Sequence, residues 1–437
     1  MPAPQLDPTL AHLLELDKYR LQQTRVPIVT VSASFKEDLK GWYGLSEDEK
    51  LPDVVFSRAH YSMAVAVATQ LWGSQMDPAM AWIVDPTNYV SRNEWGKIRL
   101  TEVIGQTIAR RPLLKQAKDL IDRFGRQKLP ILQSITPPLE YLFAEVRQPI
   151  LSMHIAAGNI LAATGKTIVQ VVTDPHVRDE YLAQAHRANI SFCVFDERTQ
   201  AEFLEKAALK GISVDPTRVI ITGPPIDPRI IKLRSHKKPW QSGTLNLCIS
   251  TGGLGTNKPE ILQLLAQLLP ELRKQHTPYR ILVYAATQSD IAQDVRALAK
   301  ENRIRVSDPE ETDAEFRLIY HPQIVDANEM LLEYGFPWAD GFITKPSGDM
   351  AYDAVAAGCF LLTLAEWGEW EHNIRMLFEQ EGISRPAMIA DIVRQLTFLQ
   401  KKQLGKSWIN KAISRSLRME KSFLNGAKEI TKIVLNA

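Results

Sequence analysis

Short apolar runs alternate with helical patterns along almost the whole chain, and this alternation constrains the fold more than any other feature. Each run has the length and composition of a buried strand. Such alternation is typical of parallel sheets covered by helices on both faces, so we expect an α/β fold. The runs are Pro27–Ala33, Ala81–Asp85, Pro130–Ser134, Ile150–His154, Thr167–Thr173, Ile190–Phe195, Val219–Thr222, Leu245–Ser250, Tyr279–Ala285, Leu318–His321, Gly341–Thr344 and Phe360–Leu364.

A polar, basic stretch without an apolar period, Arg229–Gly243, separates the first seven runs from the last five. We interpret this stretch as a linker between two Rossmann-like domains that face a central cleft. The N-terminal domain is predicted to cover residues 1–228, and the C-terminal domain residues 244–405. Residues 406–437 are expected to form a basic helix that can return to the N-terminal domain.

The segment between residues 341 and 373 carries the most specific indication of function. Its first strand run ends in a turn that opens a helical pattern, Gly358 stops this pattern, and a second strand run follows. Backbone N–H groups and a helix N-terminus would meet at the turn, where a phosphate is favoured. The alternative is an ordinary βαβ unit whose turn binds nothing. The turn consists of Lys345, Pro346, Ser347 and Gly348.

Acidic and amide side chains follow this turn. Asp353 lies one helical turn beyond Asp349, and Glu369, Glu371 and Asn373 follow the second strand run. Their oxygens can accept hydrogen bonds from a ribose diol or from sugar hydroxyls, each charge-assisted bond contributing roughly 1.5–3 kcal/mol.

A glycine-rich turn occupies a similar place earlier in the same predicted domain, after the run Leu245–Ser250. A helical pattern from Pro259 to Leu272 follows it, so its glycines would let the backbone approach a diphosphate at a helix N-terminus. The turn lacks the G-x-x-x-x-G-K-[ST] order of a P-loop. The residues expected to contact phosphate are Gly252, Gly253, Gly255 and Thr256.

These segments resemble the donor site of GT-B glycosyltransferases, most closely the family of monogalactosyldiacylglycerol synthases and processive diacylglycerol glycosyltransferases. The lipid-II-forming N-acetylglucosaminyl transferase is more distantly similar. In the family of monogalactosyldiacylglycerol synthases and processive diacylglycerol glycosyltransferases, a strand is followed by K-P-G-G-x-T, then by E-A, and then by a Gly-Gln-Glu loop that ends in Asn. The positions that match are Lys345, Pro346, Gly348, Asp353, Ala354, Gly368 and Asn373. The chain departs from the family at Ser347, at Asp353 in place of the ribose-binding glutamate, and at Glu369-Trp370, so the resemblance does not imply which sugar is used.

The resemblance also implies a catalytic base in the N-terminal domain, which must take the proton of the acceptor hydroxyl. The segment FSRAHYSMAVAVA resembles the family's G-G-G-H-x-x-A-A motif and makes His60 the first candidate. Asp53 can alternatively cap a longer helix that buries His60 in its middle. Three further side chains stand at the ends of strand runs: Asp85, His154 and Asp174. Each is a candidate for catalysis or for orienting substrate, or else is a structural group.

Composition narrows the class of protein. The formal net charge of the 437 residues is only +2, which argues against a dedicated nucleic-acid binder. No apolar run approaches the roughly 18 residues of a membrane span and no signal peptide is recognisable, so we expect a cytoplasmic protein. Neither an Asp-x-Asp pair nor a His/Cys cluster with ligand spacing occurs, so we expect no metal and no cofactor. The cysteines are expected to be buried thiols: Cys193, Cys248 and Cys359.

Two basic stretches, Asn88–Lys128 and Lys401–Lys432, also contain aromatic residues. Basic and aromatic helices can lie on anionic lipid, at about 1 kcal/mol per basic residue. In the resembling family the N-terminal domain meets the membrane, which would place the protein at the inner face of the plasma membrane. A solvated helix face is the alternative explanation.

The leading hypothesis is an inverting, metal-independent glycosyltransferase that moves a hexose from a UDP-sugar to a lipid, lipid-linked or other hydrophobic acceptor. A UDP-sugar 2-epimerase shares the fold but needs no second substrate. A non-catalytic GT-B protein that binds a nucleotide sugar is the third possibility, because the glycines before His60 are absent and Ser347 replaces a glycine.

Overall fold

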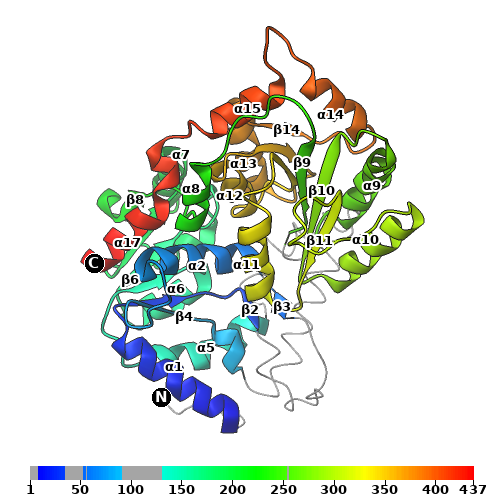
Figure 1. Cartoon of the computed structure of the whole chain (residues 1–437). Coiled ribbons are helices and arrows are strands. Elements are labelled where there is room, and N and C mark those ends of the chain that lie inside the picture. The colour runs from blue at the N-terminus through cyan, green and yellow to red at the C-terminus, as the bar shows by residue number, and fades with distance from the viewer. Residues whose placement is uncertain (1–7, 35–52, 56, 91–129, 253–254) are drawn as a thin grey trace. The chain divides into compact units, whose positions relative to one another are not determined.

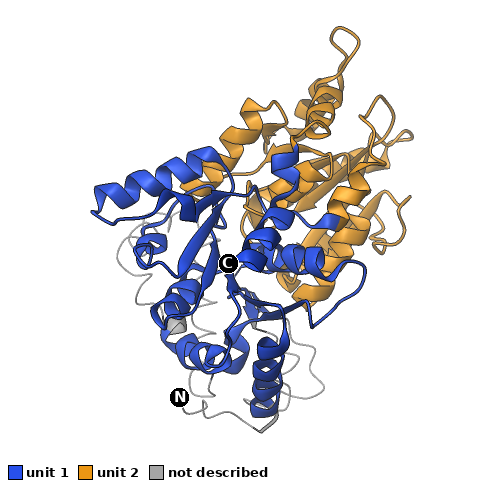
Figure 2. Cartoon of the chain, turned by 90° about the vertical axis from the view of Figure 1, so that its left-hand side faces the viewer, with its two compact units in different colours: residues 1–228, 421–437 blue, residues 229–420 orange. Residues whose placement is uncertain are grey.

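The computed structural model describes residues 8–34, 53–55, 57–90, 130–252 and 255–437, and all structural statements below concern these residues. The chain divides into two compact units. Unit 1 comprises Met1–Pro228 and Lys421–Ala437, and unit 2 comprises Arg229–Glu420 (Figure 2). Each unit is built around one parallel sheet of six strands, as the alternation of apolar runs predicts.

The sheet of unit 1 has the order β4-β1-β5-β6-β7-β8, with every neighbouring pair parallel. Figure 1 labels β4, β6 and β8 of this sheet. Its order reverses between β1 and β5, since β4 lies on one side of β1 and all later strands lie on the other. The strands are β1 (Val26–Val29), β4 (Ala81–Val84), β5 (Ile150–Ser152), β6 (Ile168–Val171), β7 (Ile190–Val194) and β8 (Val219–Ile221). A separate antiparallel pair joins β2 (Ala33–Ser34) to β3 (Val54–Val55).

One face of this sheet packs against four helices and the other against α2, which contacts α17. The apolar core between the sheet and the first four helices includes Leu14, Leu139, Leu161 and Phe203. The helices are α1 (Pro8–Gln23), α5 (Pro130–Phe143), α6 (Ile155–Ala163) and α7 (Glu197–Leu209) on the first face, then α2 (Arg58–Trp72) and α17 (Gly426–Asn436), with short α16 (Lys421–Leu424) before α17.

The predicted strand Pro130–Ser134 is wrong, because this run is the first turn of α5. Its apolar residues continue at helical spacing through Ile135, Leu139 and Leu142, all of which are fully buried. The longer 3.6-residue period therefore decides the structure of the short apolar run.

The sheet of unit 2 has the order β11-β10-β9-β12-β13-β14, again with every neighbouring pair parallel. This is the strand order 3-2-1-4-5-6 of dinucleotide-binding folds, and its order reverses between β9 and β12. The strands are β9 (Leu245–Ser250), β10 (Tyr279–Ala286), β11 (Phe316–Tyr320), β12 (Gly341–Thr344), β13 (Phe360–Thr363) and β14 (Ser384–Pro386).

Helices cover both faces of the second sheet. One apolar core joins the strands to α9 (Lys258–Leu268), α10 (Ser289–Glu301), α14 (Ile392–Gln400) and α15 (Trp408–Ser416). The other helices are α11 (Ile324–Tyr334), α12 (Met350–Ala356) and α13 (Glu369–Gln380), of which α11 contacts β10 and β11 and α12 contacts β12 and β13.

The segments predicted as linker and C-terminal helix belong to the two units as follows. Residues 229–243 belong to unit 2 and begin within a helix, α8 (Pro228–Arg234). Arg234 donates to the Ala356 carbonyl at 3.2 Å, so this segment is attached to the body of unit 2. The C-terminal region is divided, because α15 lies in unit 2 and α17 lies in unit 1.

All three cysteines are buried and free, which confirms the expectation from the sequence. Burial raises the pKa of the Cys193 thiol to about 12 and that of the Cys359 thiol to about 11. Neither thiol is therefore ionised at neutral pH.

Candidate functional site

The reversal point of the unit 2 sheet gathers the loops that the sequence singles out. Ligands of open α/β sheets bind outside the carboxyl ends of the strands at such a point. Strands β9 and β12 lie side by side there, and the Ser250 hydroxyl at the end of β9 donates to the Thr344 hydroxyl at 2.7 Å. The glycine-rich turn after β9 and the turn that begins at Lys345 after β12 therefore start from adjacent points.

The glycine-rich turn has the backbone conformation that its composition predicts. Gly255 has a φ of 67°, and its N–H donates to the Gly252 carbonyl at 2.8 Å. Asn257 is left-handed as well, with a φ of 64°, and α9 begins at the next residue. The Asn257 amide donates to the Ala365 carbonyl at 3.1 Å, which ties the turn to the loop after β13. Gly253 lies outside the described residues.

Lys345 joins three loops in one place. A Cβ atom on Gly252 would lie 2.8 Å from Lys345 Cε, so the absence of a side chain at Gly252 lets the lysine pass. The Lys345 ammonium then reaches Glu371 Oε1 on α13 at 2.5 Å. The second oxygen of Glu371 accepts the Trp367 N–H at 2.6 Å. The loops after β9, β12 and β13 thus converge on a buried ion pair.

This ion pair determines which groups remain to face an anion. Glu371 is 1% exposed and the Lys345 side chain 16%, so the carboxylate compensates the lysine charge inside the protein. The Thr256 hydroxyl is buried and has no hydrogen-bond partner in the described part of the chain. It lies 2.8 Å from the Cβ position of Gly252, beside the lysine stem. A phosphate oxygen is a suitable acceptor for such a hydroxyl.

The turn after Lys345 is compact and leads directly into α12. Ser347 Oγ donates to Asp349 Oδ1 at 2.7 Å, and the Ser347 N–H donates to the Lys345 carbonyl at 2.8 Å. Ser347 therefore supplies a hydroxyl that fixes Asp349. Pro346 and Gly348 are buried in this turn.

The three remaining candidates of unit 2 differ in exposure. Asp353 lies on α12, where its N–H donates to the Asp349 carbonyl, and it is buried. Asn373 is also buried, on α13. Glu369 is exposed in the first turn of α13, which begins after Gly368.

In unit 1 the candidate base lies at the carboxyl edge of the sheet. Ser57 caps α2 by accepting the His60 N–H at 3.3 Å, and the helix begins at Arg58. His60 is therefore in the first helical turn, and the alternative of a longer helix capped by Asp53 is wrong. The imidazole is half-buried.

Both nitrogens of the His60 ring have neighbours. Nδ1 lies 3.4 Å from the Val31 carbonyl oxygen beyond β1, and Nε2 lies 3.2 Å from Thr173 Oγ1 beyond β6. Because a carbonyl can only accept, the contact with Val31 favours a proton on Nδ1 and a lone pair on Nε2. Tyr181 extends this group, its hydroxyl lying 3.4 Å from Thr173 Oγ1.

The other unit 1 candidates lie at the same edge but have different partners. The His154 ring packs edge-on against His60, with centroids 5.2 Å apart. Asp174 accepts from Arg178 at 2.8 Å.

Asp85 is held entirely by protein groups. Its two oxygens accept the N–H groups of Ser32, Ala33 and Thr87 at 2.7–3.1 Å and the hydroxyls of Ser32 and Thr87 at 2.7–3.0 Å. Burial raises its pKa, and these hydrogen bonds oppose the rise. Asp85 is therefore a structural group that organises the chain after β1.

Sequence reasoning missed two contributors to these sites and the partner of a third. Glu371 is expected from the sequence to accept from a ribose diol or from sugar hydroxyls, but its oxygens accept from Lys345 and from the Trp367 N–H, and this pairing has no signal in the sequence. Thr173 stands beside the predicted Asp174, and it is the threonine that contacts His60. Tyr181 lies eight residues further on, where nothing in the sequence marks it.

The described residues contain no cluster of three or more His, Cys, Asp or Glu side chains able to hold a metal ion. None of their helices combines the length and apolar character that crossing a membrane requires. The basic stretch from Asn88 falls almost wholly outside the described residues. In the C-terminal stretch, Phe423 is buried and the Trp408 ring packs against Phe360 with centroids 6.0 Å apart.

Comparison with known proteins identifies the fold. No protein-family model matches the sequence, and no curated protein matches it significantly. UDP-GlcNAc 2-epimerase from Neisseria meningitidis, solved with UDP-GlcNAc, matches with a TM-score of 0.52 at 12% identity, over 94% of this chain and 99% of that one. A putative UDP-N-acetylglucosamine 2-epimerase from Listeria monocytogenes matches with a TM-score of 0.53 at 12% identity, over 92% and 93% of the two chains.

MurG from Acinetobacter baumannii matches with a TM-score of 0.48 at 11% identity, over 94% of this chain and 100% of that one. The Neisseria meningitidis and Listeria monocytogenes structures both match with TM-scores above 0.5. Together with the two parallel six-stranded sheets, they define a protein of two Rossmann-like domains. The chain has the GT-B fold, as its sequence predicts.

Proposed function

We propose that unit 2 binds the diphosphate of a UDP-sugar at the reversal point of its sheet. The observation that carries this proposal is the passage of Lys345 across Gly252 to Glu371, which assembles three loops beside the N-terminus of α9. Backbone N–H groups at a helix N-terminus favour an anion. The buried Thr256 hydroxyl has no hydrogen-bond partner among the described residues, so it can donate to the ligand.

The ion pair gives Lys345 a role that differs from direct capture of phosphate. Its charge is already balanced by Glu371, so the lysine holds the turn in place and the neutral donors bind the ligand. Asp353 is proposed to accept from the ribose diol and Asn373 and Glu369 to contact the sugar. These three roles rest on the resemblance to the donor site of GT-B glycosyltransferases and on the position of the residues after β12 and β13.

We further propose that the protein is an inverting hexosyltransferase with His60 as general base. Nε2 of the imidazole would take the acceptor's hydroxyl proton as the oxygen attacks the anomeric carbon. The bond from that carbon to the diphosphate breaks at the same time, so UDP leaves with the electron pair. A proton on Nδ1, favoured by the Val31 carbonyl, supports this role because it places the lone pair that accepts a proton on Nε2, beside the Thr173 hydroxyl.

A lipid or other hydrophobic acceptor is proposed from the family resemblance. The C-terminal basic stretch does not itself supply an aromatic membrane anchor, because Trp408 and Phe423 are packed within the protein. The acceptor is therefore to be sought by assay.

A UDP-sugar 2-epimerase is the second candidate, favoured by the two structures with TM-scores above 0.5, both described as epimerases. An epimerase would use the same donor site but would need no acceptor. It interconverts two sugars without releasing much nucleotide, whereas a transferase releases UDP for each sugar transferred.

The test is to incubate the purified protein with a panel of UDP-sugars, with and without lipid acceptors, and to quantify UDP and both sugar isomers. UDP release that rises with an acceptor is the expected result. Isomer formation without UDP release would favour the epimerase. Binding of UDP-sugar with neither product would favour a non-catalytic binding protein.

A further inference from the structure

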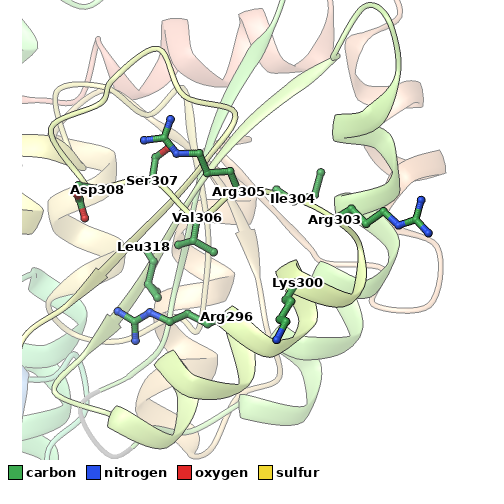
Figure 3. A pocket seen from close by; sticks show the side chains of 9 residues that line it. All are labelled: Arg296, Lys300, Arg303, Ile304, Arg305, Val306, Ser307, Asp308 and Leu318. Atoms are coloured by element: carbon green, nitrogen blue, oxygen red, sulfur yellow. The ribbon is translucent and has the colours of Figure 1, made fainter.

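Unit 2 has a basic groove at its outermost strand, separate from the loops that follow β9 and β12. The groove has a volume of about 520 Å³ and lies between the end of α10 and the segment that leads into β11 (Figure 3). Four cationic side chains and one acidic residue, Asp308, line it. Arg296 and Lys300 come from α10, and Arg303 and Arg305 from the segment after α10.

The groove combines a charged rim with an apolar floor. Figure 3 shows Arg296 and Arg305 on opposite sides of Val306 and Leu318, with Arg303 pointing away from that floor. Val306 is half-buried and Leu318 is buried. Ligand pockets commonly have volumes of about 300–1,000 Å³ and place a few polar groups around an apolar lining, so the groove has the dimensions of a binding site.

The cations of this groove are poorly neutralised by the protein. Arg305 pairs with Glu311 at 2.9 Å, but no acidic group of the described chain lies within 4.0 Å of Arg296, Lys300 or Arg303. Arg296 and Lys300 are one helical turn apart on α10, a spacing at which like charges repel. Arg296 also lies over the Tyr320 ring, 5.9 Å from its centroid. A bound anion would reduce the repulsion between Arg296 and Lys300.

The charges next to the groove further restrict the ligand. Arg305 and Ser307 also line a second hollow, which is acidic. An anion is therefore attracted to the basic groove on one side of Ser307 and repelled by the acidic hollow on the other side. The acidic residues of the second hollow are Glu310, Glu311, Asp313 and Glu315.

We propose that the groove binds a phosphoryl group attached to an apolar moiety, with the phosphoryl oxygens on Arg296, Lys300 and Arg305 and the apolar part against Val306 and Leu318. A phosphate monoester carries up to two charges and three acceptor oxygens, so it can engage several cations at once, which a carboxylate does less well. The guanidinium groups match phosphate oxygens in a bidentate manner. Both an anionic lipid headgroup and a soluble phosphate ester have this chemistry.

The experiment compares the full-length protein with the double variant Arg296→Glu and Lys300→Glu. The control is a second double variant, Lys232→Glu and Arg394→Glu, which makes the same charge change at exposed positions of the same unit. Two probes distinguish the sources of the ligand: vesicles of phosphatidylglycerol in phosphatidylcholine, and inorganic pyrophosphate measured by titration calorimetry. A polyglutamate peptide tests for binding by charge alone.

The groove variant is expected to bind at least one phosphoryl probe about tenfold more weakly than the wild type and the control variant do. Binding should weaken as salt rises, because the cations are exposed. Loss on vesicles alone identifies a lipid headgroup, and loss with pyrophosphate alone identifies a soluble ligand. Equal binding by the groove variant and the control, no binding of either phosphoryl probe, or equally tight binding of polyglutamate would overturn the proposal. The groove is separate from Lys345 and Thr256. Because pyrophosphate can also occupy the proposed donor site, only the difference between the groove variant and the control variant reports on the groove.

Discussion

Replacing Glu371 by Gln tests whether the buried ion pair holds the loops of unit 2 together. Gln has the same shape and keeps an oxygen for the Trp367 N–H, but it removes the charge that balances Lys345. Removing one partner of a buried ion pair commonly costs 3–5 kcal/mol, because the other charge is left uncompensated. Since the Lys345 side chain is 16% exposed, water can hydrate it in part. We therefore expect the free energy of unfolding to fall by about 2–4 kcal/mol.

A double-mutant cycle with Lys345→Met separates the ion pair from other effects of the substitution. The Met side chain keeps most of the lysine stem beside Gly252 and removes the ammonium group. Glu371→Gln should therefore destabilise the Lys345→Met protein by about 1–3 kcal/mol less than it destabilises the wild type. Glu379→Gln is the matched control on the same helix, since Glu379 pairs with Arg375 at the surface and its loss should cost about 0.5 kcal/mol.

The assay is urea unfolding followed by tryptophan fluorescence, with the two units fitted as separate transitions where they unfold separately. The reasoning is refuted if Glu371→Gln destabilises the Lys345→Met protein as much as the wild type. Such a result would mean that the lysine and the glutamate do not interact, and that the three loops are held by other contacts.

Three further predictions concern catalysis, ligand binding and acid stability. His60→Ala should lower turnover by about 10²–10⁴-fold with unchanged UDP affinity, measured by UDP release and calorimetry; near-normal turnover returns His60 to a structural role. Asp353→Ala should weaken UDP binding by about 10–100-fold, and unchanged affinity in a variant with wild-type melting temperature removes the ribose assignment. Burial alone would raise the pKa of Glu202, but its contacts with His176 and Lys206 lower it from 4.5 to about 2. The stability from these contacts is present above pH 4.5 and is lost as pH falls toward 2, so Glu202→Gln should flatten this acid loss by about 1–2 kcal/mol in unfolding measurements; an unchanged profile contradicts the assignment.

The fold and the donor loops could be predicted because their signals are local. A strand of six residues such as Leu245–Ser250, followed by glycines and a helical pattern, determines a strand, a turn and a helix without reference to distant residues. The turn from Lys345 to Gly348 repeats the same arrangement, and the strand order then brings the two turns together. The placement of His60 near the carboxyl edge of the unit 1 sheet follows in the same way.

The side-chain partners could not be predicted, because they come from separate parts of the sequence. Glu371 reaches Lys345 across 26 residues, and Thr173 reaches His60 across 113. The role of Asp85 could not be predicted either, because an aspartate at a strand end can bind substrate or organise a loop. The five hydrogen-bond donors around it show that it organises the loop. The basic groove also escapes sequence analysis, because only the fold places Arg296 and Arg305 around a floor that includes Leu318 of β11.

Calorimetric titration of the full-length protein with UDP tests the central claim most directly. The account predicts that UDP binds at one site per chain and that Asp353→Ala weakens this binding, while His60→Ala leaves it unchanged. The same titrations with ADP and GDP show whether the site distinguishes the base. If neither UDP nor any other nucleotide binds, the loops around Lys345 and Glu371 are not a nucleotide-sugar site, and the proposed function is wrong.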